Sequence, residues 1–129
     1  MKTSNLEEKI IKILNKERIK FIREKTYPDL KSGYYRFDFF LPEYNICIEC
    51  DGPQHYKYTK IFHKNRQDFL KAQERDRRKN SYCLGHNILL YRIPYFEIDD
   101  ISSFNDIIQD KFLVKDKWHC DYIAKSLPK

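Results

Sequence analysis

The sequence has no long apolar run. Its longest uncharged apolar stretches, such as Ile88 to Tyr91, are far shorter than the roughly 20 residues that cross a bilayer. The first residues, Met-Lys-Thr-Ser-Asn-Leu-Glu-Glu, lack the apolar core of a secretion signal. These absences exclude a membrane-spanning protein, and we expect no signal peptide and no membrane partner.

Disulfide and zinc frameworks are not indicated either. Cys47 and Cys50 are three residues apart on one predicted strand, where they point to opposite faces and do not pair easily. No paired Cys-x-x-Cys knuckle occurs among the other possible zinc ligands, which are Cys83, His86, His119 and Cys120. We therefore expect no structural zinc and a reducing intracellular location, the cytoplasm or nucleoid, with a phage or viral origin left open.

Positive charge is in excess. The 129 residues include 25 Lys and Arg against 19 Asp and Glu, a formal net charge of +6, which favours a polyanionic partner. Hydrophobic residues make up 41%, enough for a packed core. We expect a single domain over residues 1–129, with its core at about 4–112 and a basic tail at 113–129.

Apolar spacing and turn residues predict a small α/β protein with the element order α-β-β-β-α-β-α. Strands are predicted at 21–27, 34–41, 46–51 and 88–93. Helices are predicted at 4–16, at 66–82 and from a cap at Asp99 or Ser102 through Phe112, with one more turn after Lys115. The segment 52–65 between them is predicted to be a loop.

Acidic residues interrupt two of the predicted strands. Regular alternation in 34–41 places Asp38 opposite a face formed by Phe37 and Phe39, while Glu49 and Asp51 share one face of the next strand. Across a short hairpin these carboxylates lie side by side. Such a cluster implies a cation, a functional acid, or neutralisation by Arg36 and nearby lysines.

A histidine and a further acid lie near these strands. His55 follows Gly52-Pro53-Gln54, so its imidazole can face the acids, although a lone loop histidine is usually just solvated. Asp76 lies in the run Glu74-Arg75-Asp76-Arg77-Arg78-Lys79 and by itself would be a surface ion-pair residue. Composition alone therefore does not decide its role.

Five motifs occur in order along about Ser4 to Ile98. They are Ser4-x-x-Glu7, Asp38-Phe39 with Pro42, Ile48-Glu49-x-Asp51-Gly52-x-x-His55, Arg75-Asp76-x-x-Lys79, and Ile88 to Ile93. Together they resemble the very-short-patch-repair-type branch of the PD-(D/E)xK nuclease superfamily. The resemblance implies a restriction-endonuclease-like α/β core, with a mixed central sheet flanked by helices.

The resemblance also implies a metal site. According to this resemblance, Asp38 is the central metal ligand, and Glu49 and the backbone carbonyl of Cys50 are the next candidates. Oxygen ligands of this kind suit Mg²⁺, with Mn²⁺ as a possible substitute.

Three further roles follow from the same resemblance. His55 activates or positions the attacking water, Asp76 orients His55, and Glu7 is an outer acid that holds a metal-bound water. A rate that depends on His55 should rise through an ionisation near about 6.5, shifted by the neighbouring acids and metal. Glu7 also has a purely structural interpretation as part of a capping box with Ser4.

The activity implied is a Mg²⁺-dependent DNA endonuclease with His-assisted water activation. It nicks DNA as a monomer, or cuts both strands as a homodimer. Cations on the loop and the second long helix would contact phosphates in a largely sequence-independent way. These residues are Lys57, Lys60, Lys64, Arg66, Arg75 and Lys79.

Two departures from the family pattern bear on the function. Asp51 stands where the superfamily has its usual lysine, and the zinc-binding cluster of the repair enzymes is missing from 52–63. The chain is therefore closer to homing-type and phage-type relatives with a Glu, Asp, His, Asp set. The alternatives are a catalytically inactive nucleic-acid-binding module of the same fold, favoured by Asp51, and an RNA-directed nuclease.

Overall fold

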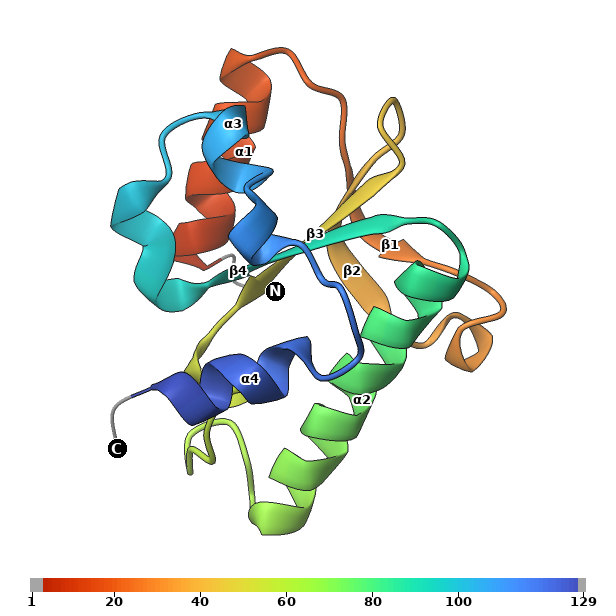
Figure 1. Ribbon diagram of the computed structural model, residues 1–129, viewed down its shortest axis with the longest axis vertical. Coiled ribbons are helices and arrows are strands. Elements are labelled where there is room, and N and C mark those ends of the chain that lie inside the picture. Colours follow the sequence, from red (N-terminus) through yellow and green to blue (C-terminus); the bar gives the residue numbers. More distant parts are fainter. Residues whose placement is uncertain (1–3, 128–129) are drawn as a thin grey trace.

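The protein is a mixed α/β fold, described by a computed structural model over residues 4–127 (Figure 1). A four-stranded mixed sheet in the order β1-β2-β3-β4 is flanked by helices. Short 3-10 turns, η1 to η4, lie at Lys31–Gly33, Pro53–His55, Tyr95–Asp100 and Asp110–Phe112. The main elements are α1 (Asn5–Lys16), β1 (Ile22–Thr26), β2 (Arg36–Leu41), β3 (Ile46–Asp51), α2 (Arg66–Gly85), β4 (Leu89–Pro94), α3 (Phe104–Ile107) and α4 (His119–Ser126).

Antiparallel and parallel pairing meet at β3. β1 pairs with β2 and β2 with β3 in antiparallel fashion, whereas β3 and β4 are parallel, with α2 as the crossover between them. A parallel pair needs such a crossover because its two strands start at the same edge. The predicted order of elements is confirmed up to β4. Within residues 4–127, no helix is long and apolar enough to cross a membrane.

α1 forms where its sequence signals predicted it. The Ser4 side chain accepts a hydrogen bond from the Glu7 backbone N–H at 3.1 Å, which caps the helix. The apolar stripe of α1 is buried against one face of the sheet, together with residues that follow β4. The apolar cluster on this face is called the α1-side core and includes Ile10, Leu14, Phe39, Leu41, Ile48, Tyr91, Ile93 and Ile107.

α2 covers the other face of the sheet with a stripe that is only partly apolar. Its buried residues recur at helical spacing, but the middle of the stripe is polar. They are Phe69, Ala72, Asp76, Lys79, Asn80 and Cys83. The apolar part packs with Phe37, Cys47 and Leu90 as the α2-side core, and the polar part meets the acids of β3.

The regular alternation predicted for β2 is wrong at Asp38. Phe37 belongs to the α2-side core and Phe39 to the α1-side core, although the two residues are two apart. β2 and β3 pair only from Phe39 onward, so the chain changes face where the ladder ends. The left-handed backbone of Glu24 (φ 53°) lies in the facing part of β1, between the Arg23–Phe39 and Lys25–Phe37 pairs.

The C-terminal part also differs from the prediction. The cap of α3 is Ser103 rather than Asp99 or Ser102, and the helix ends at Ile107. It ends early because the chain turns to pair with β4: the Val114 N–H donates to the Leu90 carbonyl at 2.9 Å. The single helical turn expected after Lys115 is the eight-residue α4, which packs on α2.

Candidate active site

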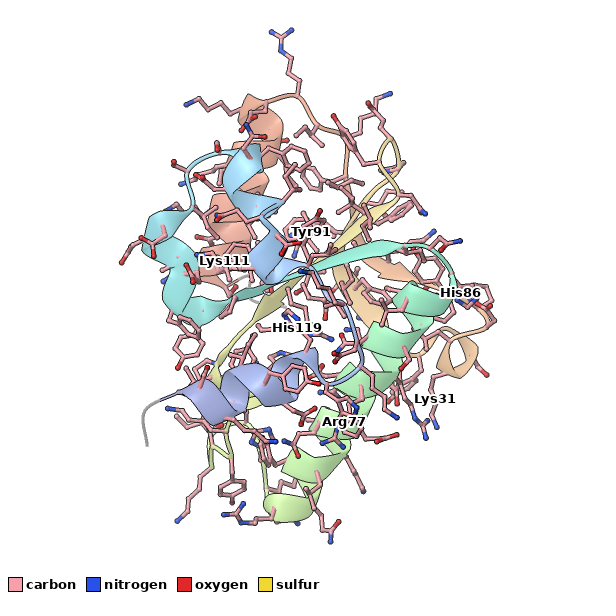
Figure 2. All side chains as sticks on the ribbon, in the orientation of Figure 1. Lys31, Arg77, His86, Tyr91, Lys111 and His119 are labelled. Carbon is pink, nitrogen blue, oxygen red and sulfur yellow. The ribbon has the colours of Figure 1, made fainter. Side chains whose placement is uncertain are left out.

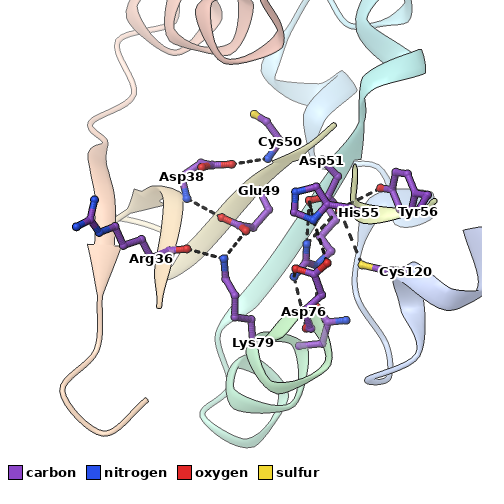
Figure 3. A network of polar contacts seen from close by, with 12 residues as sticks. Arg36, Asp38, Glu49, Cys50, Asp51, His55, Tyr56, Asp76, Lys79 and Cys120 are labelled. Atoms are coloured by element: carbon purple, nitrogen blue, oxygen red, sulfur yellow. Dashed lines mark hydrogen bonds and ion pairs between the residues drawn. The ribbon is translucent and has the colours of Figure 1, made fainter. Parts of the chain in front are cut away.

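The candidate site is built where β2 and β3 part. There the backbone of Asp38 is bonded by side chains instead of a neighbouring strand: its N–H donates to Glu49 Oε1 at 2.7 Å, and its carbonyl accepts from Arg23 Nε at 3.2 Å. The Asp38 side chain crosses back, and its Oδ2 accepts the Cys50 N–H at 2.7 Å (Figure 3). Two carboxylates thus replace the backbone ladder, which fixes Asp38 beside the backbone of Cys50.

Lys79 neutralises Glu49 from the helix above it. Its Nζ lies 2.5 Å from Glu49 Oε2 and donates to the Arg36 carbonyl (Figure 3). The prediction that Lys79 is a surface phosphate contact is therefore wrong, because its side chain is only 5% exposed and is engaged by Glu49. The Arg36 side chain points outward to Glu24 at 3.7 Å, so it is not the residue that neutralises the acids.

Asp38 is held in a form that resists ionisation. Burial and the charge of Glu49 raise its pKa well above the usual value, in spite of the Cys50 N–H and the charge of Lys79. Glu7 lies close enough to add to this repulsion, and its own pKa is also raised by burial. Glu7 Oε2 pairs with Arg23 at 2.6 Å, so its side chain serves a β1 contact while its N–H serves the helix cap.

A second polar cluster lies at the end of β3, on the α2 face. Arg92, from β4, contacts both oxygens of Asp51 at 2.9 and 3.1 Å, and both residues have no exposed surface. Arg92 Nε also donates to Asn80 Oδ1 at 2.7 Å, and Tyr56 donates to Asp51 at 3.0 Å. The residue in the superfamily's lysine position is thus committed to a buried ion pair.

His55 and Asp76 are brought together as the resemblance implied. His55 Nδ1 lies 2.9 Å from Asp76 Oδ2 and 3.6 Å from Asp51 Oδ1 (Figure 3). Burial disfavours charge on the ring, but the two acids outweigh it and raise the pKa of His55 to about 9. Although burial opposes ionisation of Asp76, the charges of Arg92 and His55 lower its pKa.

The other cations expected at phosphates are on the surface. Asn65 caps α2 by accepting the Asp68 N–H, and the loop before it carries most of them. Arg78 pairs with Glu74 at 3.2 Å, as its spacing predicted, whereas Arg77 binds Asp121 of α4. The exposed members of the predicted set are Lys57, Lys60, Lys64, Arg66 and Arg75.

Arg92 and Asn80 were missed by the sequence reasoning. Both had a usable signal: each is a polar residue at a position that the local period assigns to the interior, Arg92 in an apolar strand and Asn80 in the buried stripe of α2. A buried polar residue needs partners, so such positions could have been matched with the acids of β3.

The possible zinc ligands do not gather. His86 caps the C-terminal end of α2, stacked on Tyr82, while His119 begins α4 (Figure 2). Cys83 lies in the α2-side core, and Cys120 approaches Asp51. Within residues 4–127, no three His, Cys, Asp or Glu side chains are grouped as a ready metal site.

The comparisons with known proteins give relatives without an assigned activity. The chain is 33% identical over 92 residues to uncharacterized protein 307L of Invertebrate iridescent virus 6, which is 70% of this chain and 46% of that protein. It is 34% identical over 90 residues to uncharacterized protein 094L of Frog virus 3, 68% of this chain and 57% of that protein. No family model and no solved structure matches. The chain is therefore similar to iridescent virus and frog virus proteins and spans about half the length of these curated relatives.

Proposed function

We propose that the chain is a metal-dependent endonuclease that hydrolyses phosphodiester bonds of DNA, on a restriction-endonuclease-like core. The observation that carries the proposal is Asp38, a partly buried acid that replaces a strand contact. Within residues 4–127 its side chain receives a single hydrogen bond, from the Cys50 backbone N–H. His55, which follows the neighbouring strand β3, pairs with Asp76 of α2. An acid fixed in this way and a histidine oriented by a second acid are the groups that phosphodiester hydrolysis needs.

The residues around Asp38 fit a magnesium ion. A cation would relieve the repulsion that raises the pKa of Asp38, and the Cys50 carbonyl is a second oxygen of the kind Mg²⁺ or Mn²⁺ accepts. Each Glu49 oxygen already accepts a bond, one from Asp38 and one from Lys79, so we assign Glu49 to fixing Asp38 and not to the direct ligands. When bound, the metal would supply charge neutralisation at the phosphate and a more acidic water.

His55 would act through Nε2, because Nδ1 faces Asp76 and Asp51. With a pKa of about 9 the ring is mostly protonated at neutral pH, so there it donates a hydrogen bond to a water or to a phosphate oxygen. It accepts a proton from water only as the pH approaches that value. His55 therefore becomes an effective general base only at a higher pH than a histidine with an ordinary pKa.

The exposed cations support a nucleic-acid substrate. The loop that leaves β3 carries Lys57, Lys60 and Lys64 and ends at the N-cap of α2. His55 lies at the start of the same loop, so phosphates held by these lysines would approach the candidate site. Asp51, in place of the superfamily's lysine, was the argument for a catalytically inactive module. That argument is weaker because Asp51 binds Arg92 and so has a structural reason to be acidic.

Plasmid cleavage tests the proposal. Supercoiled DNA is incubated with the protein in Mg²⁺, in Mn²⁺ and in EDTA, with a structured RNA in a parallel arm. We expect nicked or linear DNA in either metal and none in EDTA. Asp38→Asn should lower the rate more than about a hundredfold, beyond the 10- to 100-fold cost of changing a residue behind a ligand.

Asp110→Asn is the matched control, since Asp110 is an exposed acid paired with Lys115 and belongs to η4, which contributes no residue to the candidate site. It should cut at the wild-type rate. DNA binding without cleavage in any metal would favour the inactive module, and cleavage of RNA alone would favour the RNA-directed nuclease. Equal cutting by Asp38→Asn would remove Asp38 from the site.

A further inference from the structure

A cavity of about 600 Å³ adjoins the candidate site. It lies between the first turn of α1, the end of β3 and the loop that follows, and its wall includes Glu7 and Cys50. Cys50 places it next to Asp38, because the Cys50 N–H donates to the Asp38 carboxylate. The volume is in the range of small-molecule and nucleotide pockets, so the cavity can hold one group of the substrate beside the bond to be cut.

Gln54, on the wall of this cavity, carries an amide oxygen without a partner in the described part of the chain. Its Oε1 is buried and has no hydrogen-bond partner among residues 4–127, although the residue lines the cavity wall. The amide lies against Gly52, and a Cβ at residue 52 would displace it from this position. A buried acceptor without a partner is unfavourable. Because Oε1 lies against Gly52 with almost no accessible surface, the amide must rotate away from Gly52 to accept a hydrogen bond from a donor on a bound ligand.

The rest of the wall is mainly apolar and aromatic. Phe62, from the loop, is 59% exposed, and it faces the cavity together with Tyr95, Leu6 and Ile98. An exposed phenyl ring beside an amide is suited to a flat heterocycle that stacks on one face and hydrogen-bonds along its edge. A phosphate would use neither the ring nor the apolar wall.

We infer that this cavity receives one nucleobase next to the scissile phosphate. The base stacks on Phe62, and the Gln54 amide turns away from Gly52 to meet its edge. Oε1 then accepts an edge N–H of the base, and the amide N–H₂ donates to an acceptor on the same edge. Gln54 is then a residue that positions the substrate. The inference rests on the proposed nucleic-acid substrate and adds that an unpaired or extruded base is recognised.

Equilibrium binding in EDTA tests this independently of cleavage. The probes are two fluorescein-labelled single-stranded DNA dodecamers, one of mixed sequence and one with abasic sites at every position, measured by fluorescence anisotropy. Single strands are used because no unpairing is then required. We expect the wild-type protein to bind the base-bearing probe about tenfold more tightly, as expected for one stacked base.

Gln54→Met keeps the length of the side chain and removes both polar atoms, and Phe62→Leu keeps an apolar side chain without the ring. Each should reduce the tenfold preference to less than about threefold and leave the affinity for the abasic probe unchanged. Gln67→Met, at an exposed glutamine in the first turn of α2, is the matched control and should keep the preference.

Equal affinity of the wild-type protein for both probes, or no binding of either, would overturn the inference. A preference that survives Gln54→Met would also overturn it. A protein that shows the preference but cuts no DNA in any metal would retain the cavity assignment and lose the proposed endonuclease activity. A protein that cuts without the preference would retain the activity alone.

Discussion

Asp38 and Asp51 lie on neighbouring strands, Asp38 partly buried and Asp51 fully buried, and the two carboxyl groups have different partners. Asp51 receives Arg92 on both oxygens and Tyr56 on one, so its charge is fully matched. The side chain of Asp38 receives one backbone N–H, and burial with Glu49 nearby raises its pKa. A matched buried acid is part of the framework, whereas an unmatched one is where an added cation is most favourable.

The largest effect expected from this comparison is on stability. Arg92→Met leaves Asp51 buried without its cation, and loss of one partner of a buried pair costs about 3–5 kcal/mol. Arg78→Met removes an arginine from an exposed pair with Glu74, which contributes at most about 1 kcal/mol. The free energy of unfolding in urea measures both. If Arg92→Met cost no more than Arg78→Met, Asp51 would not be a framework residue.

The pH dependence of stability is the next largest effect. The folded pKa of His55, about 9, lies above its unfolded value of about 6.5, so the folded state binds this proton more tightly. The contribution, about 3 kcal/mol, is present in full below pH 6.5 and is lost as the pH rises through 9.

Urea unfolding at intervals from pH 6 to 10 checks this sign and window. His55→Gln should lack most of the decline between pH 6.5 and 9, whereas His86→Gln, at the exposed end of α2, should keep it. A wild-type stability that is flat over this window would show that Asp51 and Asp76 do not hold a charged ring, and the same decline in His55→Gln would assign it to other groups.

The smallest effect concerns the surface cations. Arg75→Ala should flatten the slope of log affinity against log salt by roughly 0.9, the value for one phosphate contact on duplex DNA. Arg78→Ala should change the slope less, because Glu74 already holds that guanidinium. A binding titration at several salt concentrations compares them. Equal slopes for the two variants would mean that α2 is not oriented on the DNA as the site requires.

Local signals predicted much of the fold. Ser4 as a cap, the spacing of the apolar residues in α1 and the stop after Asp51 depend on near neighbours in the chain, and all agree with the structure. The contact between His55 and Asp76 was expected only through a family resemblance. It spans 21 residues and depends on how α2 packs on the sheet.

The predictions that were wrong concern residues whose placement depends on partners far away in the sequence. Phe37 changes face because β2 separates from β3 at Asp38, and Lys79 is buried because Glu49 lies beneath it. α3 ends early because 113–114 pairs with β4. In each case tertiary contact overrides the local period. For β2 and α2 the sign in the sequence was a charged residue, Asp38 or Lys79, at an interior position.

Manganese binding tests the central claim, that Asp38 holds a cation and the matched acids do not. Isothermal titration of the metal-free protein with Mn²⁺ compares the wild type, Asp38→Asn and Asp110→Asn, with no nucleic acid present. The account predicts one site in the wild type and in Asp110→Asn, and an affinity at least about tenfold lower in Asp38→Asn. Equal Mn²⁺ affinity in Asp38→Asn would contradict it.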